Sequence, residues 1–230
     1  MEGAAVGVVT GLRAEARCLR GLVVRVACSG GSSERARSEA LRLVAEGAAG
    51  LVSFGLAGGL APDLRPGALL LPESVRSPEG RSIPTDPRWR ERLRIRLESG
   101  GLLPRGDALA GSERVVATVS EKRALLETTG ALAVDTESHA VAAVAREAGV
   151  PFVILRALTD PYDRAIPQAA LETLRPDGRV RLSAVLGGVI REPRQLLALM
   201  RLGRDTAAAL ATLRRAAAAG GPDLGYGQGA

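Results

Sequence analysis

The sequence predicts a single α/β domain in which helices flank a largely parallel or mixed central sheet. The chain has 230 residues, a length that suits one domain whose core buries well over half of the unfolded surface. Short apolar runs alternate with amphipathic helical patterns, which is typical of strands followed by helices in an α/β protein. The sequence shows no internal repeat and no linker, so we expect one domain over residues 1–218.

Buried strands are expected where apolar residues form short runs bounded by glycine, proline or charged residues. These runs lie at residues 4–10, 22–28, 51–55, 67–72, 108–116, 131–134 and 150–157. Helices are expected where apolar residues recur at helical spacing. Those patterns lie at residues 11–21, 34–48, 87–99 and 120–128, and another helix begins near Asp135, Glu137 and His139.

The C-terminal part of the chain has a different character. Residues 182–218 are apolar with basic edges, and they predict helices that belong to the same domain. Residues 219–230 include the stretch GGPDLGYGQGA. This stretch offers little to bury, so we expect a disordered tail.

The composition excludes several classes of protein. Aromatic residues make up 2% of the chain, too few for the stacked rings of a single-strand nucleic-acid platform. The net charge of +6 comes from scattered arginines, with Lys122 as the sole lysine, so we expect no nucleic-acid partner. Two cysteines and one histidine provide neither a disulfide scaffold nor a structural zinc site, and we expect no metal.

The amino terminus and the apolar stretches bear on the location of the protein. MEGAAVGVVTGL lacks the basic segment and the cleavage site of a signal peptide. The apolar stretches are shorter than the roughly 20 residues that span a bilayer. We therefore expect a soluble, cytoplasmic protein.

Polar residues that follow the predicted strands are the candidates for a ligand site, because open α/β sheets bind ligands outside the carboxyl ends of their strands. Four segments qualify, at residues 11–15, 29–33, 55–59 and 156–160. The glycines of the FGLAGG segment, Gly55, Gly58 and Gly59, either let the backbone approach a flat ligand or form a tight turn. The SGGSS segment either binds phosphate through free N–H groups or caps a helix with serine.

The charged candidates also allow two interpretations each. Glu137 either serves a ligand or stabilises the dipole of the helix that it begins. Arg156 and Asp160 either belong to a site or form an ion pair that closes a loop, and His139 belongs to the core, to a pocket rim or to the chemistry. Together, Glu15, Glu137 and an Asp160 paired with Arg156 suit the cleavage of an N-glycosidic bond. That reaction needs carboxylates near an oxocarbenium-like sugar and an acid that protonates the leaving base.

Three long segments carry a family resemblance. VGVVTGLRAEA, SFGLAGGLAPDLRPGALLLPE and AVDTESHAVAAVAREAGVPFVILRALTD resemble the purine nucleoside phosphorylase and methylthioadenosine/adenosylhomocysteine nucleosidase superfamily, in its order and spacing, from Val6 to Asp160. TESHAVAA, IPQAALETLRPDGR and REPRQLLALMRLGRDT are similar to the hopanoid-associated phosphorylases within it. This resemblance implies a phosphorylase/hydrolase-like fold and the release of adenine from adenosylhopane, with phosphate as co-substrate and no cofactor.

The resemblance also implies roles for individual residues. Asp160 corresponds to the acid that donates a proton to purine N7, and Arg156 to the arginine that accompanies it. Glu137 corresponds to the glutamate that binds the ribose 2′ and 3′ hydroxyls. Glu15 corresponds to the carboxylate that activates water in the hydrolytic members. The loop that lines the base and the sugar is expected to include Ala57 and Gly58.

Three positions depart from the family pattern. Thr136 stands where methionine usually precedes the ribose-binding glutamate. Arg114, followed by Val115, stands where an aromatic ring commonly stacks on the purine, so a guanidinium would have to replace the ring. Ser53 stands where the larger phosphorylases have a phosphate-binding arginine. Phosphate binding is then expected to rest on other donors, which are Gly30, Gly31, Ser32 or Arg13.

Two alternatives to phosphorolysis stay open at this point. One is a hydrolytic methylthioadenosine or adenosylhomocysteine nucleosidase with Glu15 as the base, and the other is a catalytically silent module that binds a nucleoside or a lipid. The expected ligand is an adenine nucleoside with a bulky apolar 5′ group. We also expect a homo-oligomer, as in other family members. The apolar C-terminal helices either form a wall for a lipid or a contact with a membrane surface, or simply cap the sheet.

Overall fold

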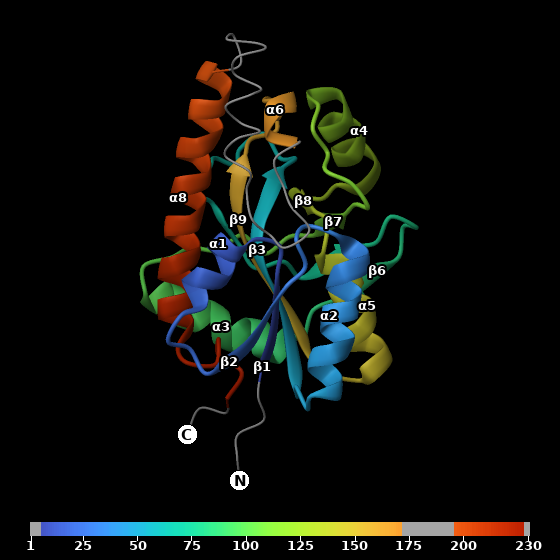
Figure 1. Cartoon of the computed structure of the whole chain (residues 1–230), viewed down its shortest axis with the longest axis vertical. Coiled ribbons are helices and arrows are strands. Elements are labelled where there is room, and N and C mark those ends of the chain that lie inside the picture. The colour runs from blue at the N-terminus through green and yellow to red at the C-terminus, as the bar shows by residue number, and fades with distance from the viewer. Residues whose placement is uncertain (1–5, 172–195, 228–230) are drawn as a thin grey trace.

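The structure is a computed structural model that describes residues 6–171 and 196–227. A nine-stranded sheet forms its centre, with helices on both faces (Figure 1). The strands are β1 (Val6–Thr10), β2 (Val24–Cys28), β3 (Gly50–Gly59), β4 (Leu69–Leu70), β5 (Ser74–Arg76), β6 (Ser82–Pro84), β7 (Leu109–Gly111), β8 (Ala133–Asp135) and β9 (Phe152–Asp160). The helices are α1 (Arg13–Ala16), the short 3-10 helix η1 (Arg17–Leu19), α2 (Ser33–Ala45), α3 (Pro87–Ser99), α4 (Val119–Thr129), α5 (Ser138–Ala148), α6 (Gln168–Leu171) and α8 (Leu196–Gly220).

The sheet is mixed, as the sequence predicts. Its order is β2-β1-β3-β8-β7-β5-β6, and β9 pairs with both β3 and β4. Strand β1 runs parallel to β2 and β3, and β3 runs parallel to β9. Strand β8 runs antiparallel to β3, and β4 runs antiparallel to β9. The α/β class with a mixed central sheet is therefore confirmed.

The ten-residue strand β3 changes its partner along its length. Its first half, from Gly50 to Ser53, pairs with β1, whereas Gly58 and Gly59 near its end pair with β8. The register with β9 also shifts between Ala57 and Gly58. The sheet therefore opens around the carboxyl half of β3, and the ends of β1, β8 and β9 meet there.

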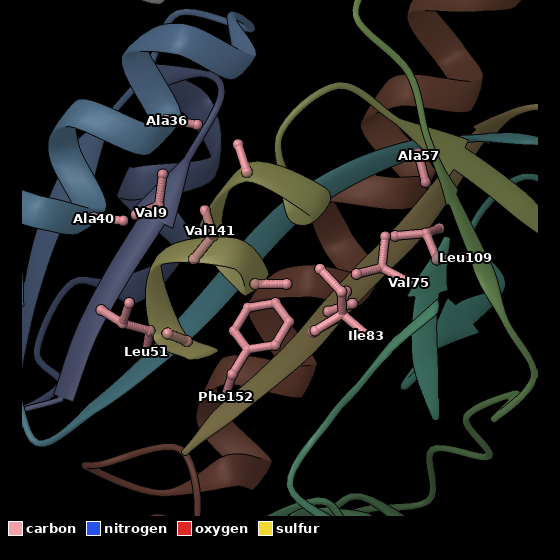
Figure 2. Close-up of a cluster of buried hydrophobic side chains, with 14 of the residues drawn as sticks. Val9, Ala36, Ala40, Leu51, Ala57, Val75, Ile83, Leu109, Val141 and Phe152 are labelled. Carbon is pink, nitrogen blue, oxygen red and sulfur yellow. The ribbon is translucent and has the colours of Figure 1, made fainter. Parts of the chain in front are cut away.

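Two apolar cores pack against opposite faces of the sheet. Side chains alternate between the two faces of a strand, and β9 shows this directly, because Phe152 and Ile154 join one core while Val153 and Leu155 join the other. The first core lies between the sheet and helices α2 and α5, as the close-up in Figure 2 shows. The second lies under helices α3 and α8. Because both faces are covered, the central strands read as nearly continuous apolar runs.

The expectation of a disordered tail from residue 219 is wrong for residues 219–227. Helix α8 continues to Gly220, and Leu224 is fully buried in the second core. The indole Nε1 of Trp89 donates a hydrogen bond to the Leu224 carbonyl at 2.8 Å, and the hydroxyl of Tyr226 donates one to the Ala49 carbonyl at 2.8 Å. Leu224 and Tyr226 therefore pack the glycine-rich stretch against the domain, and Arg92 and Arg96 of α3 bind its carbonyls and Asp223.

Other differences concern the extent of elements. The helix expected at residues 11–21 is a single turn followed by η1, and the strand expected at residues 108–116 ends at Gly111. The remainder of that run forms a loop that reaches the functional site described below. The described part of residues 182–218 is the single helix α8, and residues 182–195 lie outside the described residues. No helix within the described part of the chain is long and apolar enough to cross a membrane.

Candidate active site

A pocket lies where the carboxyl ends of β1, β3, β8 and β9 meet. Its lining comes from the loop after β1, the turn before α2, the ends of β3, β8 and β9, the loop after β7 and the segment after β9. The lining residues are Gly11, Leu12, Glu15, Gly31, Leu56, Ala57, Gly58, Arg114, Val115, Val116, Val134, Asp135, Thr136, Glu137, Thr159, Asp160 and Ile166. The four polar segments that the sequence singled out therefore converge on one pocket.

Glu15 is held as a buried carboxylate at one side of this pocket. It follows β1 in the one-turn helix α1, and its Oε2 accepts hydrogen bonds from the backbone N–H groups of Gly11 and Leu12, each at 2.8 Å. Its Oε1 accepts a third from the N–H of Leu56 at 3.0 Å. Burial raises the pKa of Glu15 above its usual range, while the nearby Arg156 and the three N–H groups oppose that rise. A fixed carboxylate of raised pKa suits a general base.

Arg156 is the cation at the centre of the carboxylate cluster. It is fully buried in β9, with its Nε 2.6 Å from Asp135 Oδ2 and one terminal nitrogen 3.1 Å from Glu137 Oε2. The same terminal nitrogen donates a hydrogen bond to the hydroxyl of Ser53 at 2.6 Å. Ser53 therefore supports the arginine of the neighbouring strand.

The expected pairing of Arg156 with Asp160 is wrong. Within the described residues, the ion-pair partners of Arg156 are Asp135 and Glu137, and that of Asp160 is Lys122. The physical reason is the rise of the strand. Both residues belong to β9, and four residues of an extended strand span about 13 Å, which is too far for direct contact.

Glu137 points into the pocket because another residue caps the helix. Asp135 Oδ1 accepts hydrogen bonds from the N–H groups of Glu137 and Ser138 at the start of α5, at 3.2 and 3.0 Å. Glu137 occupies the N-cap position but its side chain makes no capping bond, so Asp135 supplies the side-chain cap of α5. Burial raises the pKa of Glu137 to about 7, and the neighbouring carboxylates of Asp135 and Glu15 add to this rise against the opposing charge of Arg156.

Glycines make room for these carboxylates. A Cβ at Gly11 would overlap Glu137 Oε1, and one at Gly55 would lie 2.5 Å from an Arg156 nitrogen and 2.7 Å from Glu15 Oε2. Gly55 therefore leaves space for the side chains of Arg156 and Glu15 rather than for a ligand. Of the three glycines in the FGLAGG segment, Gly58 alone lines the pocket.

Asp160 lines the pocket from the end of β9, four residues and about 13 Å along the strand from Arg156, so it lies away from the Arg156 cluster. Its side chain is buried, and its Oδ2 accepts a hydrogen bond from Lys122 Nζ. Burial raises the pKa of Asp160, and the charge of Lys122 opposes the rise. Sequence reasoning missed Lys122. The available signal was a single lysine in a chain that otherwise uses arginine.

The loop after β7 contributes the rim of the pocket. Arg114 and Val115 both line it, as expected, but the Arg114 side chain is 74% exposed and is paired with Glu121 of α4 at 2.6 Å. The hydroxyl of Thr136 donates a hydrogen bond to the Gly31 carbonyl at 3.2 Å, so it links the pocket to the turn before α2.

Of the four residues expected to bind phosphate, only Gly31 is among the lining residues of this pocket. Gly31 lines the pocket, and the Ser32 side chain caps α2 by accepting a hydrogen bond from the N–H of Arg35. The Gly30 carbonyl accepts a hydrogen bond from Arg35 at 3.2 Å. Arg13 lines a separate cavity, so its expected place in this pocket is wrong. Residues two apart on a helix face different directions, and in α1 that puts Glu15 inside and Arg13 outside.

His139 lies outside the pocket lining. It is buried on α5, and its Nε2 lies 3.0 Å from Glu113 Oε1, at the border of a neighbouring polar cavity. Among the residues that the structure describes, no group of three or more His, Cys, Asp and Glu side chains could hold a metal ion.

The arrangement separates two kinds of chemistry across the pocket. On one side, three buried carboxylates surround Arg156 and offer acceptors for hydroxyl groups and for a water molecule. On the other side, Asp160 offers one carboxyl group backed by a cation. This division matches what the breaking of a bond between a sugar and a base requires: stabilisation of a cationic sugar on one side and protonation of the leaving group on the other.

Comparisons with solved structures agree on the fold. A mutant of Helicobacter pylori methylthioadenosine/S-adenosyl homocysteine nucleosidase with 5′-methylthioadenosine in its active site superposes with a TM-score of 0.67 at 18% identity, over 82% of this chain and 99% of that one. The Neisseria meningitidis 5′-methylthioadenosine/S-adenosylhomocysteine nucleosidase in complex with methylthio-immucillin-A gives 0.72 at 15% identity, over 94% and 97%. The futalosine hydrolase of Helicobacter pylori gives 0.68 at 16% identity, over 92% and 96%.

Comparisons of the sequence identify the family but no individual relative. The search of curated proteins found no match. The family model described as the phosphorylase superfamily matches residues 6–191, which is most of the chain and includes every residue of the pocket lining. With the fold and the site arranged as described, the chain belongs to the phosphorylase superfamily.

Proposed function

We propose that this pocket cleaves the N-glycosidic bond of an adenine nucleoside. The observation that carries the proposal is the placement of Glu137 and Asp160 on opposite sides of one pocket, each buried and each backed by a buried cation. Glu137 binds the ribose hydroxyls, and Asp160 gives its proton to N7 of the purine. The bond between C1′ and the base breaks, its electron pair goes to the base, and an oxygen nucleophile adds to C1′.

The preferred substrate in this proposal carries a large apolar group at the 5′ position, adenosylhopane being the specific case. The pocket lining supports this, since it includes the apolar side chains of Leu12, Val116 and Ile166. Helix α8 supports it as well. The hydroxyl of Thr206 lies 3.1 Å from that of Thr159, a pocket residue, which places α8 beside the pocket.

The amino end of α8 adds an exposed apolar surface. Leu196, Leu197 and Met200 are 44%, 66% and 63% exposed. Apolar side chains in water at the end of a helix that runs past the pocket suit a lipid-like substituent or a membrane surface that presents it.

The nucleophile in the preferred proposal is phosphate. Arg35 binds the carbonyls of Ser29 and Gly30 at 2.5 and 3.2 Å, and this turn leads into the amino end of α2. The amino end of a helix favours an anion. Gly31 of the same turn lines the pocket.

Hydrolysis is the second candidate, and the environment of Glu15 favours it. Glu15 is already oriented by three backbone N–H groups in the pocket wall. Among the described lining residues Arg114 is the one cationic side chain, and it is paired with Glu121. A doubly charged phosphate would then face several carboxylates with little positive charge beside it, whereas a water molecule would not be repelled.

One experiment separates the two candidates. Adenine release is measured with and without phosphate from adenosylhopane, methylthioadenosine and adenosine, with the Asp160→Asn variant as a control for contaminating enzymes. Release from adenosylhopane only with phosphate, together with a sugar phosphate, would support the preferred proposal. Phosphate-independent release, fastest on methylthioadenosine and lost in Glu15→Gln, would support the nucleosidase. No release from any of the three would contradict both.

A further inference from the structure

Lys122 is a buried lysine with every donor in use. It lies on α4 with its side chain fully buried. Its Nζ donates hydrogen bonds to Asp160 Oδ2, to the carbonyl of Pro161 at 2.8 Å and to the carbonyl of Arg164 at 2.9 Å. An ammonium group has three N–H donors, so this site satisfies the group completely.

The choice of lysine at this position has a physical reason. The chain uses arginine at all its other positions with a permanent positive charge. A guanidinium is planar, with five donors in a fixed fork, whereas an ammonium is a compact charge with three donors. Three acceptors that converge on one point, as Asp160 Oδ2 and the two carbonyls do, fit the ammonium and not the fork.

The contacts also fix the orientation of Asp160. Its Oδ2 accepts a hydrogen bond from Lys122, which leaves Oδ1 as the oxygen without a side-chain donor among the described residues. Gly58 on the strand beside it leaves room for the carboxyl group, because a Cβ there would lie 3.2 Å from Oδ2 and 3.5 Å from Oδ1. The groups with charge that face Asp160 are Lys122 and Arg164, with Glu15 and Glu137 elsewhere in the pocket wall.

We infer that Lys122 is a positioning residue for the proton transfer to the leaving base. It holds Asp160 in the orientation that presents its free oxygen to the purine, and its charge stabilises the carboxylate that remains once the proton has gone to N7. This inference rests on the proposed function of the pocket. In a buried site a carboxylate without a counter-charge is costly to form, so the cation lowers the barrier where that charge develops.

A purely structural role must be distinguished from this one. Lys122 also anchors the segment from Pro161 to Arg164, which leads to Ile166 in the pocket lining. If this anchoring were its whole contribution, removing Lys122 would damage the pocket in a way that does not depend on Asp160.

A double-mutant cycle makes the distinction. The variants are Lys122→Met, Asp160→Asn and the two combined, with kcat and KM for adenine release as the readout. We expect Lys122→Met to lower kcat about 10²-fold, within the range that general-acid catalysis contributes, with KM changed less than about threefold. In the Asp160→Asn background, we expect the added Lys122→Met substitution to lower kcat by less than about threefold further. The carboxylate on which Lys122 acts is then absent.

Two further variants keep the test interpretable. Lys122→Gln retains a donor for the carbonyls but lacks the charge, so it is expected to fold and to show the same loss of kcat even if Lys122→Met does not fold. Arg123→Met removes a positive charge from the exposed side of the same helix and is expected to leave kcat within about twofold of wild type, as surface charges act weakly.

The outcomes are separable from those of the proposed function. A wild-type protein that releases no adenine from any nucleoside would overturn the proposed function, and this inference with it. An active wild type with Lys122→Met and Lys122→Gln at full kcat would overturn the inference alone. Equal losses from Lys122→Met in the wild-type background and in the Asp160→Asn background would assign Lys122 a structural role and also overturn it.

Discussion

The two ends of the pocket use buried charge in opposite ways. At the sugar side, the single cation Arg156 lies among three carboxylates, those of Glu15, Asp135 and Glu137. At the base side, the single cation Lys122 serves one carboxylate, that of Asp160. Both clusters are buried and both are built on β9, yet the first has an excess of negative charge and the second is balanced.

This difference accounts for how each side holds protons. Where carboxylates outnumber the cation, burial and mutual repulsion favour a retained proton, and the pKa of Glu137 rises to about 7. Where the numbers match, burial also raises the pKa of Asp160, but Lys122 works against that rise. Burial thus raises carboxyl pKa values on both sides, and the nearby cation opposes the rise on each: Arg156 for Glu137 and Lys122 for Asp160.

The largest expected effect comes from removing the cation of the crowded side. Arg156→Met would leave three buried carboxylates without a counter-charge, and we expect it to lower the free energy of unfolding by about 3–5 kcal/mol. Chemical denaturation monitored by circular dichroism measures this. A loss below about 1 kcal/mol would show that the carboxylates do not depend on Arg156.

The excess of carboxylates also predicts a pH dependence of stability. The pKa of Glu137 rises from 4.5 to about 7 on folding, so the folded state binds more protons between these values. The free energy of unfolding is then expected to fall as pH rises through this window, by on the order of 2–3 kcal/mol for this group.

Glu137→Gln isolates the contribution of that residue. The variant cannot titrate at position 137, so its free energy of unfolding should change less between pH 4.5 and 7 than that of the wild type. Glu15 and Asp160, whose pKa values are also raised, remain and give a residual slope of the same sign. Identical slopes in the two proteins would contradict the raised pKa.

Gly11, which packs against the carboxyl group of Glu137, provides a test of packing in the site. A Cβ at Gly11 would overlap Glu137 Oε1, so Gly11→Ala should displace that carboxylate and cost about 1–3 kcal/mol together with activity. Gly203→Ala is the matched control. It lies in α8 with nothing within 4 Å of the added carbon, and it is expected to stabilise by up to about 1 kcal/mol. Equal effects of the two substitutions would refute the packing argument.

The smallest expected effect belongs to the exposed rim. Arg114 is 74% exposed and paired with Glu121, so Arg114→Ala should leave the free energy of unfolding nearly unchanged. If its guanidinium stacks on the purine, the variant should raise KM about fivefold with kcat unchanged, which corresponds to about 1 kcal/mol of stacking. An unchanged KM would remove Arg114 from the purine contact.

The sequence predicts the sheet and the convergence of the site well, for a definite reason. Apolar runs mark strands, and the carboxyl ends of strands are where ligands bind in such sheets. Glu15, Glu137 and Asp160 each follow or end a strand, and all three line the pocket. Topology therefore brings these segments together, and the direction of each side chain within its segment decides whether it lines the pocket, as Glu15 does and Arg13 does not.

The partners of these residues could not be predicted in the same way. Which cation faces which carboxylate depends on strand register and on helix placement. Arg156 and Asp160 look like neighbours in the sequence but are separated by the rise of β9, and Lys122 comes from a helix 38 residues away. The capping role of Asp135 could not be predicted from its position either. Glu137 occupies the N-cap position of α5, but Asp135 accepts the capping hydrogen bonds.

The most direct test of the separate roles of Glu137 and Asp160 compares two leaving groups. An N7-methylated adenine nucleoside already carries the positive charge that protonation would supply, so its base leaves without an acid. We predict that Asp160→Asn lowers kcat about 10²- to 10⁴-fold on the ordinary nucleoside and leaves the methylated one within about tenfold of wild type, whereas Glu137→Gln impairs both. Equal losses on both substrates for both variants would contradict the separate roles of the two ends of the pocket.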